Sequence, residues 1–241
     1  MNEMIQLFRG ALVLDTKTFA DLKASPDVFR KGFMFVLIVG LIVGLVTGLV
    51  GLVQGLTTSP AQQKAQALEG MKQFTAFMPP EAVQQMLDSM EMGFRIGERI
   101  SKEAKAPLPG QVETLFKQIG VVVSQPFGWL ASLILYGALV HIFAKLLGGR
   151  ATIAQMFGVS SLTVAPHLLD ALGWVPCLGG LFGLVAFVWC VVVYVKGTAV
   201  AHEMSNGKAL LAVLLPIIVG VLLVVLLFVV LFILIAASGG R

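Results

Sequence analysis

The chain has 241 residues, of which 57% are hydrophobic and only 12% are charged, and its formal net charge at pH 7 is +4. This composition excludes an ordinary soluble globular protein and is typical of proteins that cross a membrane several times. The chain has no basic run and no platform of basic and aromatic residues, so the positive charge does not indicate nucleic-acid binding. We relate it to membrane orientation and to contact with the lipid bilayer.

Residues 1–31 mix basic and acidic side chains, which is not typical of a signal peptide. We interpret them as a cytoplasmic N-terminal segment that contains a short interfacial helix. Ser25, Pro26 and Asp27 then form a helix start signal directly before the first apolar run. We therefore expect that run to be an uncleaved membrane anchor.

Five stretches lack Asp, Glu, Lys and Arg, and a helix needs about 20 mostly apolar residues to cross a bilayer. The stretches are residues 32–63, 118–144, 151–169, 171–195 and 209–240. They predict an all-α fold, a five-helix transmembrane bundle with helices near 32–56, 119–146, 158–173, 177–202 and 209–236. The third is the shortest; if it lies flat on one surface instead, the chain crosses four times. Residues 119–241 then form a four-helix membrane region that completes the bundle together with helix 32–56.

Glycines recur along one side of the first predicted span. At 100° per residue they fall within a wedge of about 80°: Gly40, Gly44, Gly48, Gly51 and Gly55. Small residues let helix backbones approach closely in lipid, so this face is expected to be a helix-packing surface. The partner is either another helix of the same chain or a second copy in a homodimer, and we favour the first.

Residues 57–118 form the only sizeable predicted extramembrane piece. Two helical stripes of apolar residues, separated by Pro79 and Pro80, predict an amphipathic helical hairpin between the first two spans. Such faces mostly pack on each other or on lipid, but methionine-rich faces also adapt to partners. The residues of this possible partner surface are Phe74, Phe77, Met86, Met90 and Phe94, with Leu68 beside them.

Polar side chains recur at helical spacing in the third predicted span. They are Ser160, Thr163, His167 and Asp170, followed by Trp174. Apolar residues occupy the other side, so the intramembrane polar face is expected to point into the bundle. Pro166 removes a backbone donor within this segment, and neighbouring groups must satisfy the carbonyl that it frees.

The second half of the chain resembles the prokaryotic branch of the Yip-type family, named for Ypt/Rab-GTPase-interacting membrane proteins. The resemblance rests on Pro166, a Gly/Pro-rich break at 173–180, Trp189, and the turn Ala201-His202 followed by Ser205-Asn206-Gly207-Lys208-Ala209, with Pro216 in the last helix. It covers residues 120–236 best and does not extend to 57–118. It implies five membrane helices with a cytoplasmic N-terminus. The Asp-Leu-Tyr-Gly-Pro box of the eukaryotic branch is absent, so we do not expect Rab-type GTPase binding.

Basic residues near span ends predict the orientation, because cytoplasmic loops collect Lys and Arg. Five lie in the N-terminal segment, two in the second loop and two in the fourth, against none in the third loop and one at the C-terminus. The N-terminus and the second and fourth loops are therefore expected inside. We expect the protein in the bacterial inner (cytoplasmic) membrane.

His167 and Asp170 are the one ionisable pair within a predicted span, which suggests a proton relay or ion pathway. Alternatively they are structural, with Asp170 near the outer end and His167 bonded to the carbonyl that Pro166 frees. His202-Glu203 lacks the second His of a zinc protease motif, and the pairs needed for intramembrane catalysis are missing. We expect no catalytic, cofactor or metal site, and therefore no enzyme.

Three function classes fit these features. A non-catalytic membrane scaffold or interaction protein, with a role in membrane organisation or trafficking, is favoured by the helix-packing devices. An accessory subunit of a larger membrane complex is the second, with residues 57–118 docking to other membrane-protein subunits. A small transporter or channel is the third, and it requires polar faces from several helices to converge.

Overall fold

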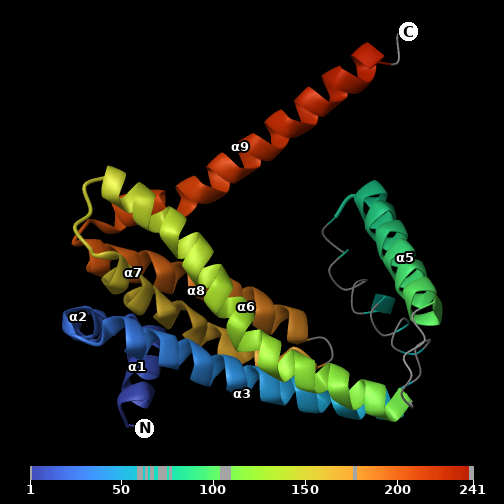
Figure 1. Ribbon diagram of the computed structural model, residues 1–241, viewed down its shortest axis with the longest axis horizontal. Coiled ribbons are helices and arrows are strands. Elements are labelled where there is room, and N and C mark those ends of the chain that lie inside the picture. The colour runs from blue at the N-terminus through green and yellow to red at the C-terminus, as the bar shows by residue number, and fades with distance from the viewer. Residues whose placement is uncertain are drawn as a thin grey trace. The chain divides into compact units, whose positions relative to one another are not determined.

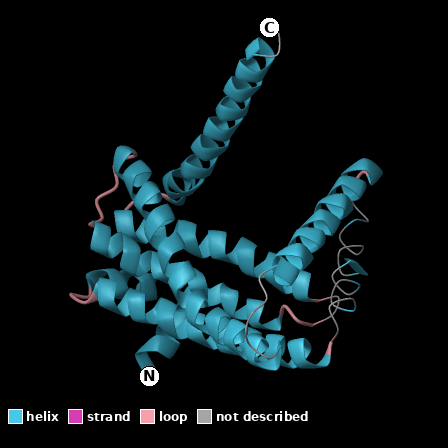
Figure 2. Ribbon diagram, turned by 45° about the vertical axis from the view of Figure 1, so that its right-hand side comes forward, coloured by secondary structure: helices cyan, strands magenta, loops and turns pink. Residues whose placement is uncertain are grey.

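The computed structural model describes residues 2–58, 62, 65, 68–69, 75, 78–103, 110–175 and 178–238. Every regular element among them is a helix (Figures 1 and 2). The fold class is therefore all-α, as predicted. Four helices are long and apolar enough to cross a membrane: α3 (Val28–Thr57), α6 (Gly110–Leu146), α8 (Gly179–His202) and α9 (Asn206–Ser238, of which Asn206–Leu231 meets both criteria).

The third predicted span takes a different form from the α-helix that its polar spacing indicated. It consists of a short α7 (Ile153–Ser160) followed by a 3-10 helix, η2 (Ser161–Leu172). Ser161 Oγ donates to the Gly158 carbonyl at 2.6 Å, and Thr163 Oγ1 donates to the Ser160 carbonyl at 2.7 Å. Both hydrogen bonds join a side chain to the carbonyl three residues before it, and Pro166 has no backbone N–H to donate. These two features favour a 3-10 helix over an α-helix.

The N-terminal segment forms two short helices, α1 (Asn2–Leu12) and α2 (Thr16–Ala24). The Asp15 carboxylate caps α2 by accepting hydrogen bonds from the Lys17 and Thr18 amides and the Thr18 hydroxyl, and these bonds hold the pKa of Asp15 below its usual value. Phe19 is fully buried beside α7 and α8. At least this part of the segment packs on the protein. The start signal at 25–27 is followed by α3 at Val28, as the sequence predicts.

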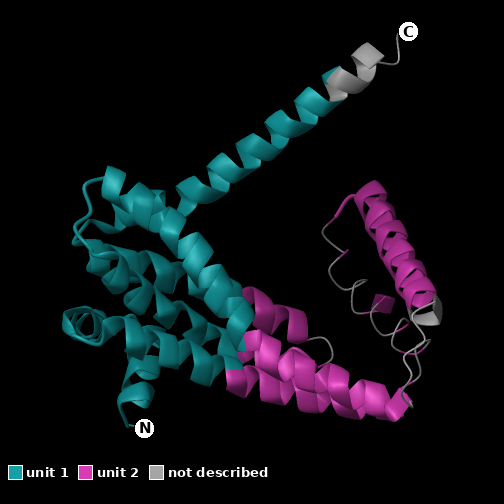
Figure 3. Cartoon of the chain, in the orientation of Figure 1, with its two compact units in different colours: residues 1–40, 126–168, 185–241 teal, residues 41–125, 169–184 magenta. Residues whose placement is uncertain are grey.

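The chain forms two compact units (Figure 3). Unit 1 comprises residues 1–40, 126–168 and 185–241, and unit 2 comprises 41–125 and 169–184. In unit 1 the buried core brings together α3, α6, α7, α8 and the start of α9. Its members include Phe35, Val36, Val140, Met156, Leu162, Val193 and Ala212.

The glycines of α3 face α6 of the same chain. In unit 1, a Cβ added at Gly40 would lie 2.7 Å from Pro126 Cα. In unit 2, a Cβ at Gly44 would lie 3.0 Å from the Val122 carbonyl oxygen. A Cβ at the other three glycines would meet side-chain atoms of Val122, Gln118 and Thr114 of α6: Gly48, Gly51 and Gly55. At Gly40 and Gly44 the nearest atoms belong to the backbone of α6, so glycine allows the two helix backbones to approach closely there.

The predicted extramembrane insertion is described mainly by α5 (Pro80–Glu103), which has Glu81 in its first turn as predicted. Met86 and Met90 are partly buried within unit 2, whereas Phe94 is exposed. Phe74 and Phe77 lie outside the described residues, so the first helix of the predicted hairpin stays a prediction.

We expect Gly40→Ala to destabilise the protein by about 1–3 kcal/mol, because the added methyl would overlap Pro126 and push α3 from α6. Gly128→Ala is the matched control, since a Cβ at Gly128 meets nothing within 4 Å. That change should be neutral or stabilising by up to about 1 kcal/mol. Thermal unfolding in mild detergent measures both. Equal tolerance of the two changes would contradict close packing at Gly40.

Candidate functional site

The polar side chains of the third predicted span do not form one uniform site. Ser160 and Thr163 are buried, and Thr163 and His167 line a pocket within unit 1. Asp170 belongs to unit 2, where its backbone carbonyl accepts the Gly173 amide at 2.9 Å. Trp174 is 52% exposed and lies in the following turn. Of the predicted polar face, the structure therefore brings Thr163 and His167 to a shared cavity.

The pocket has a volume of about 270 Å³ and lies among four elements of unit 1. Its lining contains no Asp, Glu, Lys or Arg. From α6 come Trp129, Ser132, Leu133 and Tyr136; from η2 Thr163, Val164 and His167; from α8 Phe187, Cys190, Val191 and Tyr194; and from α9 Val213, Leu214 and Ile217. The cavity is thus largely apolar, with a few uncharged polar groups on its wall.

Aromatic contacts hold the pocket wall. The His167 imidazole lies 5.4 Å from the Trp129 ring, centre to centre. Tyr136 and Tyr194 meet edge to face with ring centres 5.5 Å apart, a geometry that aromatic pairs favour. His167 is therefore held against the Trp129 ring on the pocket wall.

The two tyrosine hydroxyls of the pocket differ in their bonding. The Tyr136 hydroxyl donates to the Val213 carbonyl in the turn of α9 that precedes Pro216. The Tyr194 hydroxyl is buried and has no hydrogen-bond partner among the described residues. Ser160 is its polar neighbour, but the Ser160 hydroxyl donates to Met156 Sδ at 3.5 Å. Tyr136 thus fastens α9 to α6, whereas Tyr194 leaves a buried polar group unused.

A histidine pair lies at one end of α6 and α8. His141 Nδ1 is 3.2 Å from His202 Nε2, which allows one N–H···N hydrogen bond. The His202 carbonyl accepts the Arg150 amide at 3.1 Å, and His202 Nδ1 is buried with no partner among the described residues. A Cβ at Gly149 would lie 2.3 Å from this nitrogen, so a glycine is required there.

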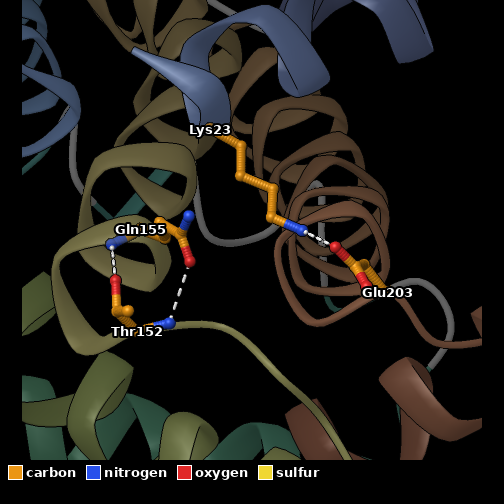
Figure 4. Close-up of polar contacts among 4 residues, drawn as sticks. All are labelled: Lys23, Thr152, Gln155 and Glu203. Carbon is orange, nitrogen blue, oxygen red and sulfur yellow. Dashed lines mark hydrogen bonds and ion pairs between the residues drawn. The ribbon is translucent and has the colours of Figure 1, made fainter. Parts of the chain in front are cut away.

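Three predicted inside segments meet at the same end of unit 1. Lys23 Nζ donates to Glu203 Oε1 at 2.6 Å (Figure 4), and Lys208 Nζ donates to the Leu147 carbonyl at 3.5 Å. The Lys23 hydrogen bond and charge lower the pKa of Glu203. The same view shows the α7 capping box, in which Thr152 and Gln155 exchange hydrogen bonds. We call this region, residues 141–150 and 196–208 with Lys23, the polar end.

Sequence reasoning missed the histidine pair. It placed His202 in a turn, whereas the structure has His202 as the last residue of α8, and His141 lies one turn before Lys145 near the end of α6. The two residues are 61 positions apart, so no local periodicity links them. Only the antiparallel return of the chain through α7, η2 and α8 brings the imidazoles together.

The chemistry available to the described residues is limited. No group of three or more His, Cys, Asp or Glu among them is placed to hold a metal ion. The histidine pair has no Ser or Cys nucleophile bonded to it in the described contacts. What this arrangement does is to join helices through hydrogen bonds and to enclose an uncharged pocket.

The fold and these sites define a class: an integral membrane protein whose helices are joined by close glycine packing and buried polar bonds. Comparison with family models then identifies the family. Residues 10–228 match the Yip1 domain, so the chain belongs to the Yip1 domain family, as the sequence motifs indicated. Neither the curated proteins nor the solved structures contain a match.

We expect Tyr136→Phe to destabilise the protein by about 0.5–1.5 kcal/mol, because the Val213 carbonyl loses its donor from α6. Tyr194→Phe is the matched control and should be neutral or slightly stabilising, since its hydroxyl is buried without a partner. Thermal unfolding in detergent compares them. A larger loss for Tyr194→Phe would mean that its hydroxyl bonds Ser160 and that the assignment of the two tyrosines is wrong.

Proposed function

We propose that this protein is a non-catalytic membrane scaffold or interaction protein that crosses the membrane five times and presents its insertion, residues 57–118, to partners in membrane organisation or trafficking. The observation that carries the proposal is how the polar groups within the apolar segments are used. Tyr136 bonds Val213, His141 bonds His202, and Ser161 and Thr163 bond backbone carbonyls. These groups hold the bundle together, which is what a platform for partners requires.

Chain geometry supports the fifth crossing. The Arg150 amide bonds the His202 carbonyl, so the chain just after α6 and the end of α8 lie side by side. A continuous helix of 24 residues is about 36 Å long, which is enough for α8 to cross the bilayer and begin on the far side. We infer that the connection from α6 to α8 then crosses as well. The contour of α7 and η2 is about 36 Å, enough for a hydrocarbon core of about 30 Å.

Charge supports the orientation. The segments that meet at the polar end are the ones in which Lys and Arg collect: the N-terminal segment, the second loop and the fourth loop. Because cytoplasmic loops are enriched in basic residues, we place the polar end and the N-terminus in the cytoplasm, with residues 57–118 and the C-terminus outside. We propose the bacterial cytoplasmic membrane because the sequence motifs resemble the prokaryotic branch of the family.

The transporter alternative has less support. A route for ions needs charged or polar side chains from several helices facing one path. The pocket that His167 lines carries no charged residue, and most of its wall is apolar. His167 itself lies against the Trp129 ring. We therefore assign His167 and Asp170 structural roles.

The insertion is the best candidate for partner recognition. Its helix α5 presents exposed apolar side chains, including Met92, Ile96 and Ile100, between charged ones. Exposed apolar residues on an amphipathic helix fit a protein or lipid surface. If the partner is a permanent complex, the protein is an accessory subunit of that complex, which is the alternative form of this proposal.

Deleting residues 61–105 and joining the ends with a short Gly/Ser linker tests partner recognition. The bundle should still insert and remain monodisperse, because its core lies in the spans, but co-purifying proteins should be lost. As a control, a linker of the same composition inserted after Asn206 leaves α5 intact and should keep the partners. A deletion variant that retains every partner would show that recognition lies elsewhere.

A further inference from the structure

With α6 and α8 crossing the membrane as proposed above, the pocket between α6, η2, α8 and α9 lies at the depth of the hydrocarbon core. At about 1.5 Å per residue, Tyr136 lies about 15 Å and Phe187 about 22 Å from the ends of their helices at Leu146 and His202. A hydrocarbon core is about 30 Å thick. The material that surrounds this pocket is therefore acyl chain, not water or lipid headgroup.

The rim of the pocket opens toward that hydrocarbon. Phe187 of α8 is 61% exposed and Ile217 of α9 is 51% exposed, and both line the pocket. Beyond Ile217, the described side chains of α9 are exposed in nearly every direction. Figure 1 shows α9 leaving the other helices of unit 1 after its first turns. Pro216 of α9 directly precedes the exposed lining residue Ile217.

The chemistry of the wall favours hydrocarbon over ordered water. A water molecule needs two to four polar partners in a cavity. Here Tyr136 and Thr163 already donate to backbone carbonyls, the Tyr194 hydroxyl is buried, and the remaining wall is apolar apart from Ser132, His167 and Cys190. An apolar cavity of about 150 Å³ is already large enough for benzene, and this one holds about 270 Å³. The volume suits a segment of flexible hydrocarbon.

We propose that this pocket binds the hydrocarbon chain of a membrane lipid, inserted near Pro216 of α9 between Phe187 and Ile217. The lipid chain occupies the space next to the hydrogen bond by which Tyr136 holds α9 at Val213. The favourable free energy of binding comes from van der Waals packing. Moving the lipid chain from the bilayer into the pocket removes no apolar surface from water, so the hydrophobic effect does not contribute. The proposal goes beyond the scaffold function and does not depend on which partner binds the insertion.

A photoreactive phospholipid with a diazirine near the methyl end of one acyl chain tests this. It is titrated into the full-length protein in detergent, irradiated, and the adducts are mapped by mass spectrometry. We expect adducts on 129–136 and 187–194 to saturate at one lipid per chain. Adducts on the outer part of α9, residues 221–231, should rise in proportion to the added lipid because that surface is open.

A matched pair of substitutions on α8 sharpens the test. Val191→Phe fills the pocket and should lower adduct yield there about tenfold. Val188→Phe adds the same ring at a side chain that is 52% exposed and does not line the pocket, and should leave the yield unchanged. If Val191→Phe does not purify as a monodisperse protein, the wild-type saturation curve decides alone.

Three results would overturn the proposal. Adducts on the lining residues that rise without saturation, in parallel with those on α9, would indicate bulk lipid only. Equal yields from Val191→Phe and Val188→Phe would place the bound chain elsewhere. Cross-links to a second copy from a photoreactive amino acid at Ser132 would mean that a helix of another chain occupies the pocket.

Discussion

In hydrocarbon, every backbone polar group needs a partner within the protein, and this requirement is sharpest where proline removes a donor. Three helices among the described residues contain a proline in their interior: Pro126 in α6, Pro166 in η2 and Pro216 in α9. Each lies near a close contact between helices or a side-chain hydrogen bond to a backbone carbonyl.

The surroundings of the three prolines differ. Pro126 cannot donate to the Val122 carbonyl, and α3 approaches that carbonyl at Gly44, where a Cβ would lie 3.0 Å from the oxygen. The glycine thus allows the weak Cα–H···O contact that helix interfaces favour. Pro166 lies in a 3-10 helix whose preceding turns carry hydroxyl bonds from Ser161 and Thr163. Pro216 follows Val213, whose carbonyl accepts a hydrogen bond from Tyr136.

Much of this was predictable, because the governing signals are local. Charge-free runs predicted the long helices, the spacing of Gly40 to Gly55 predicted a packing face, and residues 25–27 predicted the start of α3. The 3-10 form of η2 was not predictable from polar spacing, since that reading assumes 100° per residue. The His141–His202 pair and the pocket were not predictable either, because they arise where segments distant in sequence meet.

The central claim is that the connection between α6 and α8 crosses the membrane. The N-terminal segment, the second loop and the fourth loop, which meet at the polar end, then lie on one side of the membrane. Single cysteines at Ser89, Trp174 and Ser205, in a chain carrying Cys177→Ser and Cys190→Ser, test it with a membrane-impermeant maleimide. Ser89 and Trp174 variants should react in intact cells, and the Ser205 variant only after permeabilisation. Protection at Trp174 together with reaction at Ser205 in intact cells would show that residues 153–172 do not cross.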